Sequence, residues 1–341
     1  MIKHIMIISI VLLNVYFPVL GISSERPKNV ELKIIGFSPG TSMQLRADLI
    51  AEALRREYPD WNVKALATAR ASADVHKHRA EKTANFFLSL MPWPAEIEAY
   101  GPEFKKIGVD FEKLYIWFPV IPSEIKQTHF WVLRKTGLTS LKDVILKKYP
   151  LKVGLMFPSH LPMFLRLLGF YGISQKDLES WGGKIVNVNF GAPVGPELMR
   201  GGKIDAGFAW TGVPNPAFLQ ASDLDWHLLP LAEETELLRK VEEFEFGRTI
   251  IRAGSYPNVK KDIPTIGQIE WLASIPGKVS EEITYWVIKG IWKQREFLAS
   301  GFPGFKEVLD PKFISLAVGA LRTSADLGAV KFYREQGWIK K

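Results

Sequence analysis

The chain has 341 residues, of which 47% are hydrophobic and 23% charged, so it is long enough for two domains or one large one. It contains no cysteine, which excludes disulfides, thiolate metal sites, a cysteine nucleophile and a cysteine-linked lipid anchor. The formal net charge is +8, but the basic residues are scattered, which argues against nucleic acid as a partner. The charge is typical of a solvated surface, or alternatively of a positive field that attracts small anions.

Residues 1–23 have the pattern of a cleavable export signal. Lys3 precedes the apolar run Ile5–Leu20, and small residues that suit cleavage follow it. Asn14 and Pro18 interrupt the run, which is short for a membrane span of about 20 apolar residues. We therefore predict an exported protein, with an uncleaved membrane anchor as the alternative.

From about residue 30, short apolar runs alternate with amphipathic ones, which predicts repeated β-α-β units and a parallel sheet. The first group comprises strands at Val30–Gly36, Asn62–Leu66 and Phe86–Leu90 and helices at Ser42–Glu57 and Asp74–Lys82. In the first helix, Leu45, Leu49, Ala53 and Leu54 form the apolar face, which leaves Arg46 off that face.

The β-α-β pattern restarts near residue 152. Before it come two apolar runs, Leu114–Val120 and Phe130–Arg134, separated by a polar stretch, and a short helix at Thr139–Val144. The second group comprises strands at Lys152–Met156, Lys184–Asn189 and Ile204–Ala209 and helices at Leu161–Gly169 and Glu197–Arg200. The restart predicts a second sheet and a second lobe. No low-complexity linker separates the groups, so we expect strands that cross between the lobes, and a hinge.

The last part of the chain returns to strand-like patterning and ends in helices. Thr249–Arg252 and Ile263–Ile275 have strand-like patterns, and Glu281–Ser300 has the apolar spacing of one long helix. We assign residues 28–127 and 248–341 to lobe 1 and residues 128–247 to lobe 2.

The segment Gly201–Ala217 has the pattern of a binding loop. Its apolar run is followed by a predicted loop with Trp210, Thr211 and Gly212, and Pro216 is suited to open a helix. A buried strand that ends in a loop and then a helix is where an open α/β sheet places its ligand.

The segment Gly36–Ser42 resembles a phosphate loop but has no lysine before Thr41, so it fails the test for nucleotide binding. A loop that feeds a helix N-terminus still offers backbone N–H groups and a positive dipole end to an anion. Thr41 or Ser42 is also expected to cap the helix.

Motifs for catalysis are missing. The six histidines have no metal-ligand spacing, and neither an HExxH nor a GxSxG pattern occurs. We find no acid/base pair. The sequence therefore predicts a protein that is not an enzyme and that uses no metal and no cofactor.

Three stretches resemble motifs of the TAXI family, the solute-binding proteins of tripartite ATP-independent periplasmic (TRAP) transporters. These stretches are Gly201–Phe208 with Gly212–Pro214, Ala253–Pro257 with Asp262–Gly267, and Gly328–Gly337. The resemblance implies a two-lobed α/β periplasmic-binding-protein (Venus-flytrap) fold, with mostly parallel sheets flanked by helices and a ligand cleft between the lobes. It also implies a periplasmic receptor for a small organic anion such as an amino acid or keto acid. TRAP membrane permease subunits would then be its partner. The alternative is the binding protein of an ABC importer for sulfonates, nitrate or thiamine precursors.

Three binding loops depart from the family pattern. The family's glycine-rich first loop is replaced here by Gly36–Ser42, its Thr-Gly-Gly-Ser loop by Ala67–Ser72, and its Gly-Ser-Gly-Thr loop by Phe157–His160. Because Arg70, Phe157 and His160 replace glycines, they should shrink or recharge the pocket. We therefore expect a carboxylate different from the family's usual ligands.

The candidate ligand contacts lie on the loops that follow the predicted strands. They are Ser38, Thr41, Ser42, Arg70, Ser72 and Trp93 from lobe 1, Ser159, His160, Trp210 and Thr211 from lobe 2, and Tyr256 near the crossing. A salt bridge from Arg70 to the ligand carboxylate is the sharpest hypothesis. Either tryptophan, Trp93 or Trp210, is alternatively an ordinary core or interface residue.

Overall fold

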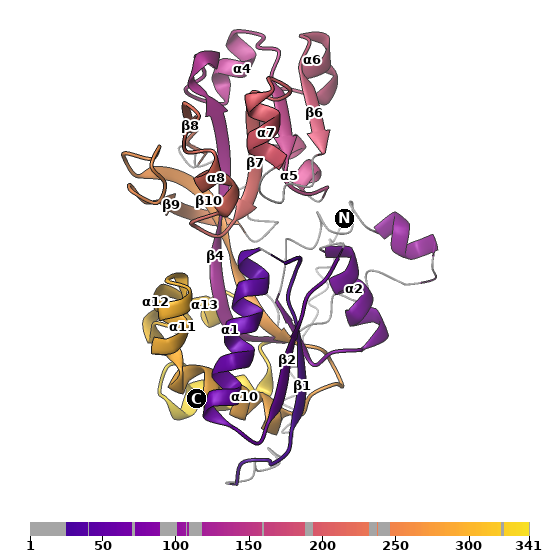
Figure 1. Ribbon diagram of the computed structural model, residues 1–341, viewed down its shortest axis with the longest axis vertical. Coiled ribbons are helices and arrows are strands. Elements are labelled where there is room, and N and C mark those ends of the chain that lie inside the picture. Colours follow the sequence, from indigo (N-terminus) through magenta and orange to yellow (C-terminus); the bar gives the residue numbers. More distant parts are fainter. Residues whose placement is uncertain are drawn as a thin grey trace, which may run out of the picture.

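A computed structural model describes residues 25–39, 41–69, 72–88, 101–106, 108, 118–158, 160–187, 194–231, 237, 246–321 and 324–340. The expected signal over residues 1–23 lies outside these ranges. The described chain forms two lobes stacked along the long axis of the molecule (Figure 1). Both ends of the described chain contribute to one lobe, and the middle of the chain builds the other.

Lobe 1 is a small parallel sheet covered by helices. Its strands are β1 (Glu31–Ile35), β2 (Asn62–Leu66) and β3 (Phe86–Leu88), with β1 between the other two. Its helices are α1 (Ser42–Glu57), α2 (Ser72–Glu81), α10 (Glu281–Lys293), α11 (Arg295–Gly301), α12 (Gly304–Val308), α13 (Pro311–Gly319) and α14 (Leu327–Glu335). The expected bounds of α1 and β2 are confirmed.

Lobe 2 repeats this plan. Its parallel strands are β5 (Lys152–Leu155), β6 (Lys184–Asn187) and β7 (Ala206–Thr211). Two short strands, β8 (Trp226–Leu228) and β9 (Gly247–Ile251), pair with the two long strands that join the lobes. Its helices are α4 (Lys142–Leu146), α5 (His160–Phe170), α6 (Gln175–Ser180), α7 (Val194–Arg200) and α8 (Pro216–Gln220).

Two long antiparallel strands join the lobes, β4 (Phe118–Leu133) and β10 (Ile263–Ser274). They lie at the centre of one continuous sheet with the order β2-β1-β3-β10-β4-β7-β5-β6. Figure 1 shows β4 running from one lobe into the other. The expected two-lobed α/β fold with crossing strands is thus confirmed, but the expected second sheet is wrong, because β4 and β10 join both sets of strands in one sheet. The polar stretch between the two expected strands is in fact the middle of β4, because its polar side chains are buried and paired there.

The segment 248–263, which we assigned to lobe 1, packs with lobe 2. Ile251, Tyr256 and Val259 share an apolar cluster with Trp131 and Trp226 of lobe 2. The return to lobe 1 therefore occurs within β10.

Three local expectations were wrong. Trp210 and Thr211 are not in a loop, because they continue β7 and pair with Thr128 and Gln127 of β4. The expected long helix Glu281–Ser300 breaks at Gln294, whose side chain donates to Glu57 of α1. Arg46 is fully buried and Leu45 is 43% exposed, the reverse of what the expected apolar face of α1 gave for these two residues, although Ala53 and Leu54 of that face are buried.

No helix in the described ranges combines the length and the apolar character needed to cross a membrane.

Candidate ligand-binding site

The loops that follow β1 and β5 meet between the lobes. Phe37 comes two residues after β1 and Phe157 two residues after β5, and their ring centroids lie 5.6 Å apart in an edge-on contact. The carboxyl ends of these strands therefore face one another. This is the edge at which open α/β sheets bind ligands.

The lobe 1 loop is fixed by the first turn of α1. Thr41 caps this helix, because its hydroxyl oxygen accepts the N–H of Gln44 at 3.2 Å and its O–H donates to the carbonyl of Ser38 at 2.8 Å. Gln44 in turn accepts the N–H of Phe37 at 3.1 Å. Ser38, Thr41 and Ser42 are half-buried. The expected cap is confirmed, and the ligand contacts of these residues stay predictions.

The lobe 2 side is an uncharged aromatic wall. His160, the first residue of α5, lies with its ring 4.1 Å from that of Trp210 and 5.3 Å from that of Phe157. Both His160 and Trp210 are buried in the lobe. Burial lowers the pKa of His160 to about 3, so the imidazole is neutral near pH 7.

Tyr256 and Thr211 hold the loop that follows β7. The Tyr256 hydroxyl accepts the N–H of Asn215 at 2.9 Å and lies 3.0 Å from Nε2 of His129. Burial lowers the pKa of His129 to about 4, so this ring is neutral, and its Nδ1 donates to the carbonyl of Gln127 at 2.8 Å. Thr211 accepts from the Asn215 side chain at 3.0 Å. Both hydroxyls are thus engaged within the protein.

Three of the expected contacts, Arg70, Trp93 and Ser159, lie outside the described residues. Ser72 is the first residue of α2, and only its backbone is described. Their roles stay predictions.

A buried ionic cluster lies on the crossing strands, and the sequence analysis missed it. One guanidinium nitrogen of Arg46 lies 2.7 Å from Glu124 of β4, and another lies 2.5 Å from Glu270 of β10. Lys126 pairs with the other oxygen of Glu270 at 2.6 Å, and Ser123 donates to Glu270 at 3.0 Å. The available signal was a pair of charges, Glu124 and Lys126, at alternate positions of a strand with apolar neighbours.

The two carboxyls of this cluster differ in their proton affinity. Burial raises the pKa of Glu124 to about 7, and repulsion from Glu270 adds to this effect against the attraction of Arg46. Burial also tends to raise the pKa of Glu270. The attraction of Arg46 and Lys126 together outweighs this effect of burial and lowers the pKa of Glu270. Glu270 is thus ionised near pH 7, whereas Glu124 is only partly ionised.

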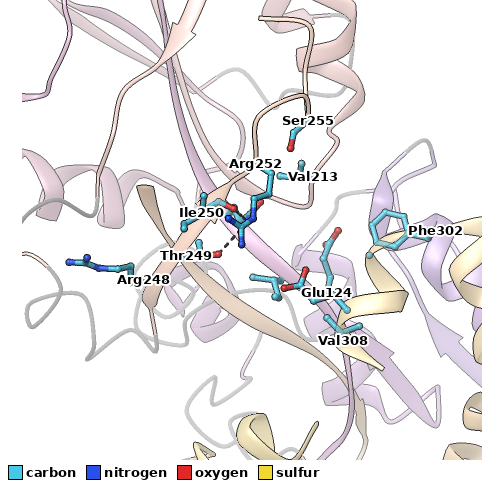
Figure 2. A pocket seen from close by; sticks show the side chains of 13 residues that line it. Glu124, Val213, Arg248, Thr249, Ile250, Arg252, Ser255, Phe302 and Val308 are labelled. Carbon is cyan, nitrogen blue, oxygen red and sulfur yellow. Dashed lines mark hydrogen bonds between the residues drawn. The ribbon is translucent and has the colours of Figure 1, made fainter. Parts of the chain in front are cut away.

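A cavity of about 450 Å³ lies beside this cluster and is lined by both lobes. Its floor is β4, including Glu124 and Gln127. One side comes from β9 and the loops of lobe 2, with Val213, Arg252 and Ser255, and the other from the turn between α11 and α12, with Phe302 and Val308 (Figure 2).

Two glycines make room for the polar side chains of this floor. A Cβ on Gly212 would lie 1.6 Å from a carboxylate oxygen of Glu124, so only glycine fits there. A Cβ on Gly267 would lie 2.7 Å from the side chain of Thr249. With that space free, Gln127 reaches across to β9 and donates to the Ile250 carbonyl at 2.8 Å.

Within the described residues, no group of three or more histidine, aspartate or glutamate side chains is placed to hold a metal ion.

The model of the NMT1-like family matches residues 48–337, and the chain belongs to this family. A search of curated proteins found no match.

Among solved structures, the chain is similar to the periplasmic sulfonate-binding protein SsuA of a sulfonate ABC transporter from Methylobacillus flagellatus KT. The identity is 14%, the coverage 92% of this chain and 98% of that one, and the TM-score 0.48. It is also similar to the alkanesulfonate-binding protein SsuA from Xanthomonas axonopodis pv. citri bound to MOPS, with 12% identity, 91% and 85% coverage, and a TM-score of 0.47. A TctC solute-binding protein from Polaromonas matches with 13% identity, 91% and 95% coverage, and a TM-score of 0.46. At these identities the likeness concerns the fold alone.

Proposed function

We propose that this protein is an extracytoplasmic solute-binding receptor that captures a small organic anion between its lobes and delivers it to a membrane permease. The observation that supports this most directly is the contact between Phe37 and Phe157, which brings the carboxyl ends of β1 and β5 together. Loops from two lobes that share crossing strands form a cleft that closes about a hinge. The receptor makes and breaks no bond.

The chemistry of the facing loops suits an anion. Ser38 and Ser42 lie half-buried beside the N-terminus of α1, where the helix dipole is positive. Arg70 follows on the next loop and supplies the counter-ion for a carboxylate. The neutral His160 and the Trp210 ring form an apolar wall behind Phe157. The ligand is therefore a small carboxylate, with amino acids and keto acids the first to test.

For the partner we propose a TRAP permease of the TAXI type, because three stretches of the chain resemble that family's motifs. The alternative is an ABC importer. An uptake assay with the purified receptor and its permease in proteoliposomes distinguishes the two transporters. An ion gradient drives uptake by a TRAP permease, whereas ATP inside the vesicle drives uptake by an ABC importer.

Thermal unfolding of the mature protein against amino acids, dicarboxylates, keto acids, aromatic acids and sulfonates tests the receptor function. A ligand at 100 times its Kd stabilises the native state by about 2.7 kcal/mol, which raises the midpoint by degrees. Arg70→Ala should abolish that shift, while Arg134→Ala, an exposed cation of lobe 2, should preserve it. Unchanged affinity in Arg70→Ala would rule out the salt bridge, and a flat response to every class would count against the receptor.

A further inference from the structure

We propose that the cavity between β9 and the α11–α12 turn is a second binding site, which takes a small zwitterion with a carboxylate at one end and an ammonium group at the other. The cavity uses none of the loop residues on which the proposed function rests. A second site there goes beyond the proposed receptor function, and its test is independent of the test of that function.

The two sides of the cavity have opposite charges. Arg252 lies on the lobe 2 side together with Arg248, and Glu307 of α12 lies on the lobe 1 side. Arg252 uses one nitrogen to pair with Asp262 at 2.8 Å, and the other N–H groups of its guanidinium can donate to a carboxylate. Glu307 is exposed, and no ion pair joins it to another residue of the described ranges, so its carboxylate can accept an ammonium group.

The space between these charges is shaped for a short carbon chain. Phe302 and Val308 are buried apolar residues of the lobe 1 side, and Val213 and Ile250 face the cavity from the lobe 2 side. Figure 2 shows Phe302 and Val308 across from Val213 and Arg252. A cavity of about 450 Å³ lies at the lower end of the range for small-molecule sites, roughly 300–1,000 Å³. The ligand is therefore small.

Gln127, on the floor of the cavity, is held by hydrogen bonds to β9. The amide nitrogen of Gln127 donates to the Ile250 carbonyl at 2.8 Å and lies 3.3 Å from the Thr249 hydroxyl, so β4 and β9 are tied together. Because the Gln127 side chain already makes these hydrogen bonds, it needs little ordering when a ligand binds.

The cavity also adjoins the hinge. Arg46 contacts two of its lining residues, since its guanidinium pairs with Glu124 at 2.7 Å and lies 5.4 Å from the centre of the Phe302 ring. Because the lining comes from both lobes, an occupant would favour one angle between them. A ligand here can shift the open and closed populations only by its differential affinity for the two forms.

Titration calorimetry of the full mature chain tests this site with a series of defined probes. The series is glycine, β-alanine, 4-aminobutyrate and 5-aminovalerate, with butyrate, valerate and butylamine as probes that lack one charge. We expect one chain length to bind with a Kd below about 1 mM and the singly charged probes to bind at least tenfold more weakly. No zwitterion binding below about 1 mM would overturn the proposal.

Neutral variants locate the binding. Arg252→Gln and Glu307→Gln should each weaken the best zwitterion at least tenfold. The matched controls Arg134→Gln and Glu296→Gln, which remove exposed charges elsewhere, should leave it unchanged. Binding that survives both cavity variants would overturn the site.

Arg70→Ala separates the two proposals. It should weaken the receptor ligand and leave the zwitterion unaffected. If Arg70→Ala weakened the zwitterion as strongly as the cavity variants do, the cavity would not be a second site.

Discussion

Glu124 and Glu270 lie directly opposite one another on the two crossing strands, and Arg46 of α1 bridges them. Like charges at opposed positions of neighbouring strands repel. Arg46 and Lys126 compensate this repulsion, and all four side chains are buried. The crossing strands between the lobes are therefore held by an ionic cluster contributed by α1, β4 and β10, where an apolar core would otherwise be expected.

Removing Arg46 should be strongly destabilising. Arg46→Met leaves two buried carboxyls with Lys126 as their remaining cation in the cluster, and breaking a buried ion pair from one side costs about 3–5 kcal/mol. Urea unfolding of the two proteins measures the loss. The control is Arg55→Met on the exposed part of the same helix, where the salt bridge contributes at most about 1 kcal/mol. Equal losses in both variants would contradict the role of the cluster.

The pH dependence of stability should differ between wild type and Glu124→Gln. The pKa of Glu124 in the folded state is raised to about 7, above the ordinary value of 4.5. Between about pH 4.5 and 7, Glu124 is therefore protonated in the folded state and ionised in the unfolded state. The contribution of Glu124 to stability is therefore present below about pH 4.5 and is lost as pH rises to about 7. Stability measured from pH 4.5 to 7.5 should fall more steeply for wild type than for the glutamine variant. Parallel curves would contradict the raised pKa.

Buried His160 should give the opposite pH dependence of stability. The folded pKa of His160 is lowered to about 3, so the unfolded state binds a proton first as pH falls below about 6.5. Neutral His160 thus contributes stability that is lost as pH falls from about 6.5 toward about 3. His160→Phe, which keeps the ring contacts with Trp210 and Phe157, should be less sensitive to acid than wild type. Unfolding midpoints at pH 4 and pH 7 measure the difference, and an unchanged gap between them would count against this role.

The amphipathic and alternating patterns predicted most of the scaffold, and α1 and β2 were placed residue for residue. Such patterns work because they report burial against a sheet, a short-range property of each element. They failed for Arg46, because its burial depends on two carboxylates that come from strands far away in the chain. Leu45 took the exposed place beside it for the same reason.

The candidate site was harder to predict than the scaffold. The glycine and proline signals after residue 210 indicated a loop, yet Trp210 and Thr211 still pair with β4, because the sheet extends wherever a neighbouring strand offers partners. The cavity was not predicted, since its sides come from α12 and β9, which no local pattern relates. Only contacts across the fold bring Arg252 and Glu307 to one space.

Adding a methyl group at Gly212 should disturb the packing around Glu124 of β4. In Gly212→Ala the new Cβ would meet a Glu124 oxygen at 1.6 Å, so the loop or the carboxyl must move, and overpacking of this kind costs about 1–3 kcal/mol. Gly319→Ala is the control, because nothing lies within 4 Å of its Cβ position. The loss caused by Gly212→Ala should be smaller in a Glu124→Ala background than in the wild type, because the clashing carboxyl is then absent. Thermal unfolding of the single and double variants measures this, and equal losses in both backgrounds would show that the clash lies elsewhere.

The role of Thr41 can be divided into capping and ligand binding by comparison with a second helix cap. Thr41 caps α1 beside the facing loops, and Ser280 caps α10, accepting the N–H of Ile283 at 3.2 Å. Losing either cap to alanine should lower the free energy of unfolding by about 1 kcal/mol. Because the Thr41 hydroxyl also holds the loop that carries Ser38, Thr41→Ala should in addition weaken the proposed receptor ligand, by about tenfold. Ser280→Ala should leave that affinity unchanged. Calorimetric Kd values for the two variants make the comparison, and equal affinities would reduce Thr41 to a structural cap.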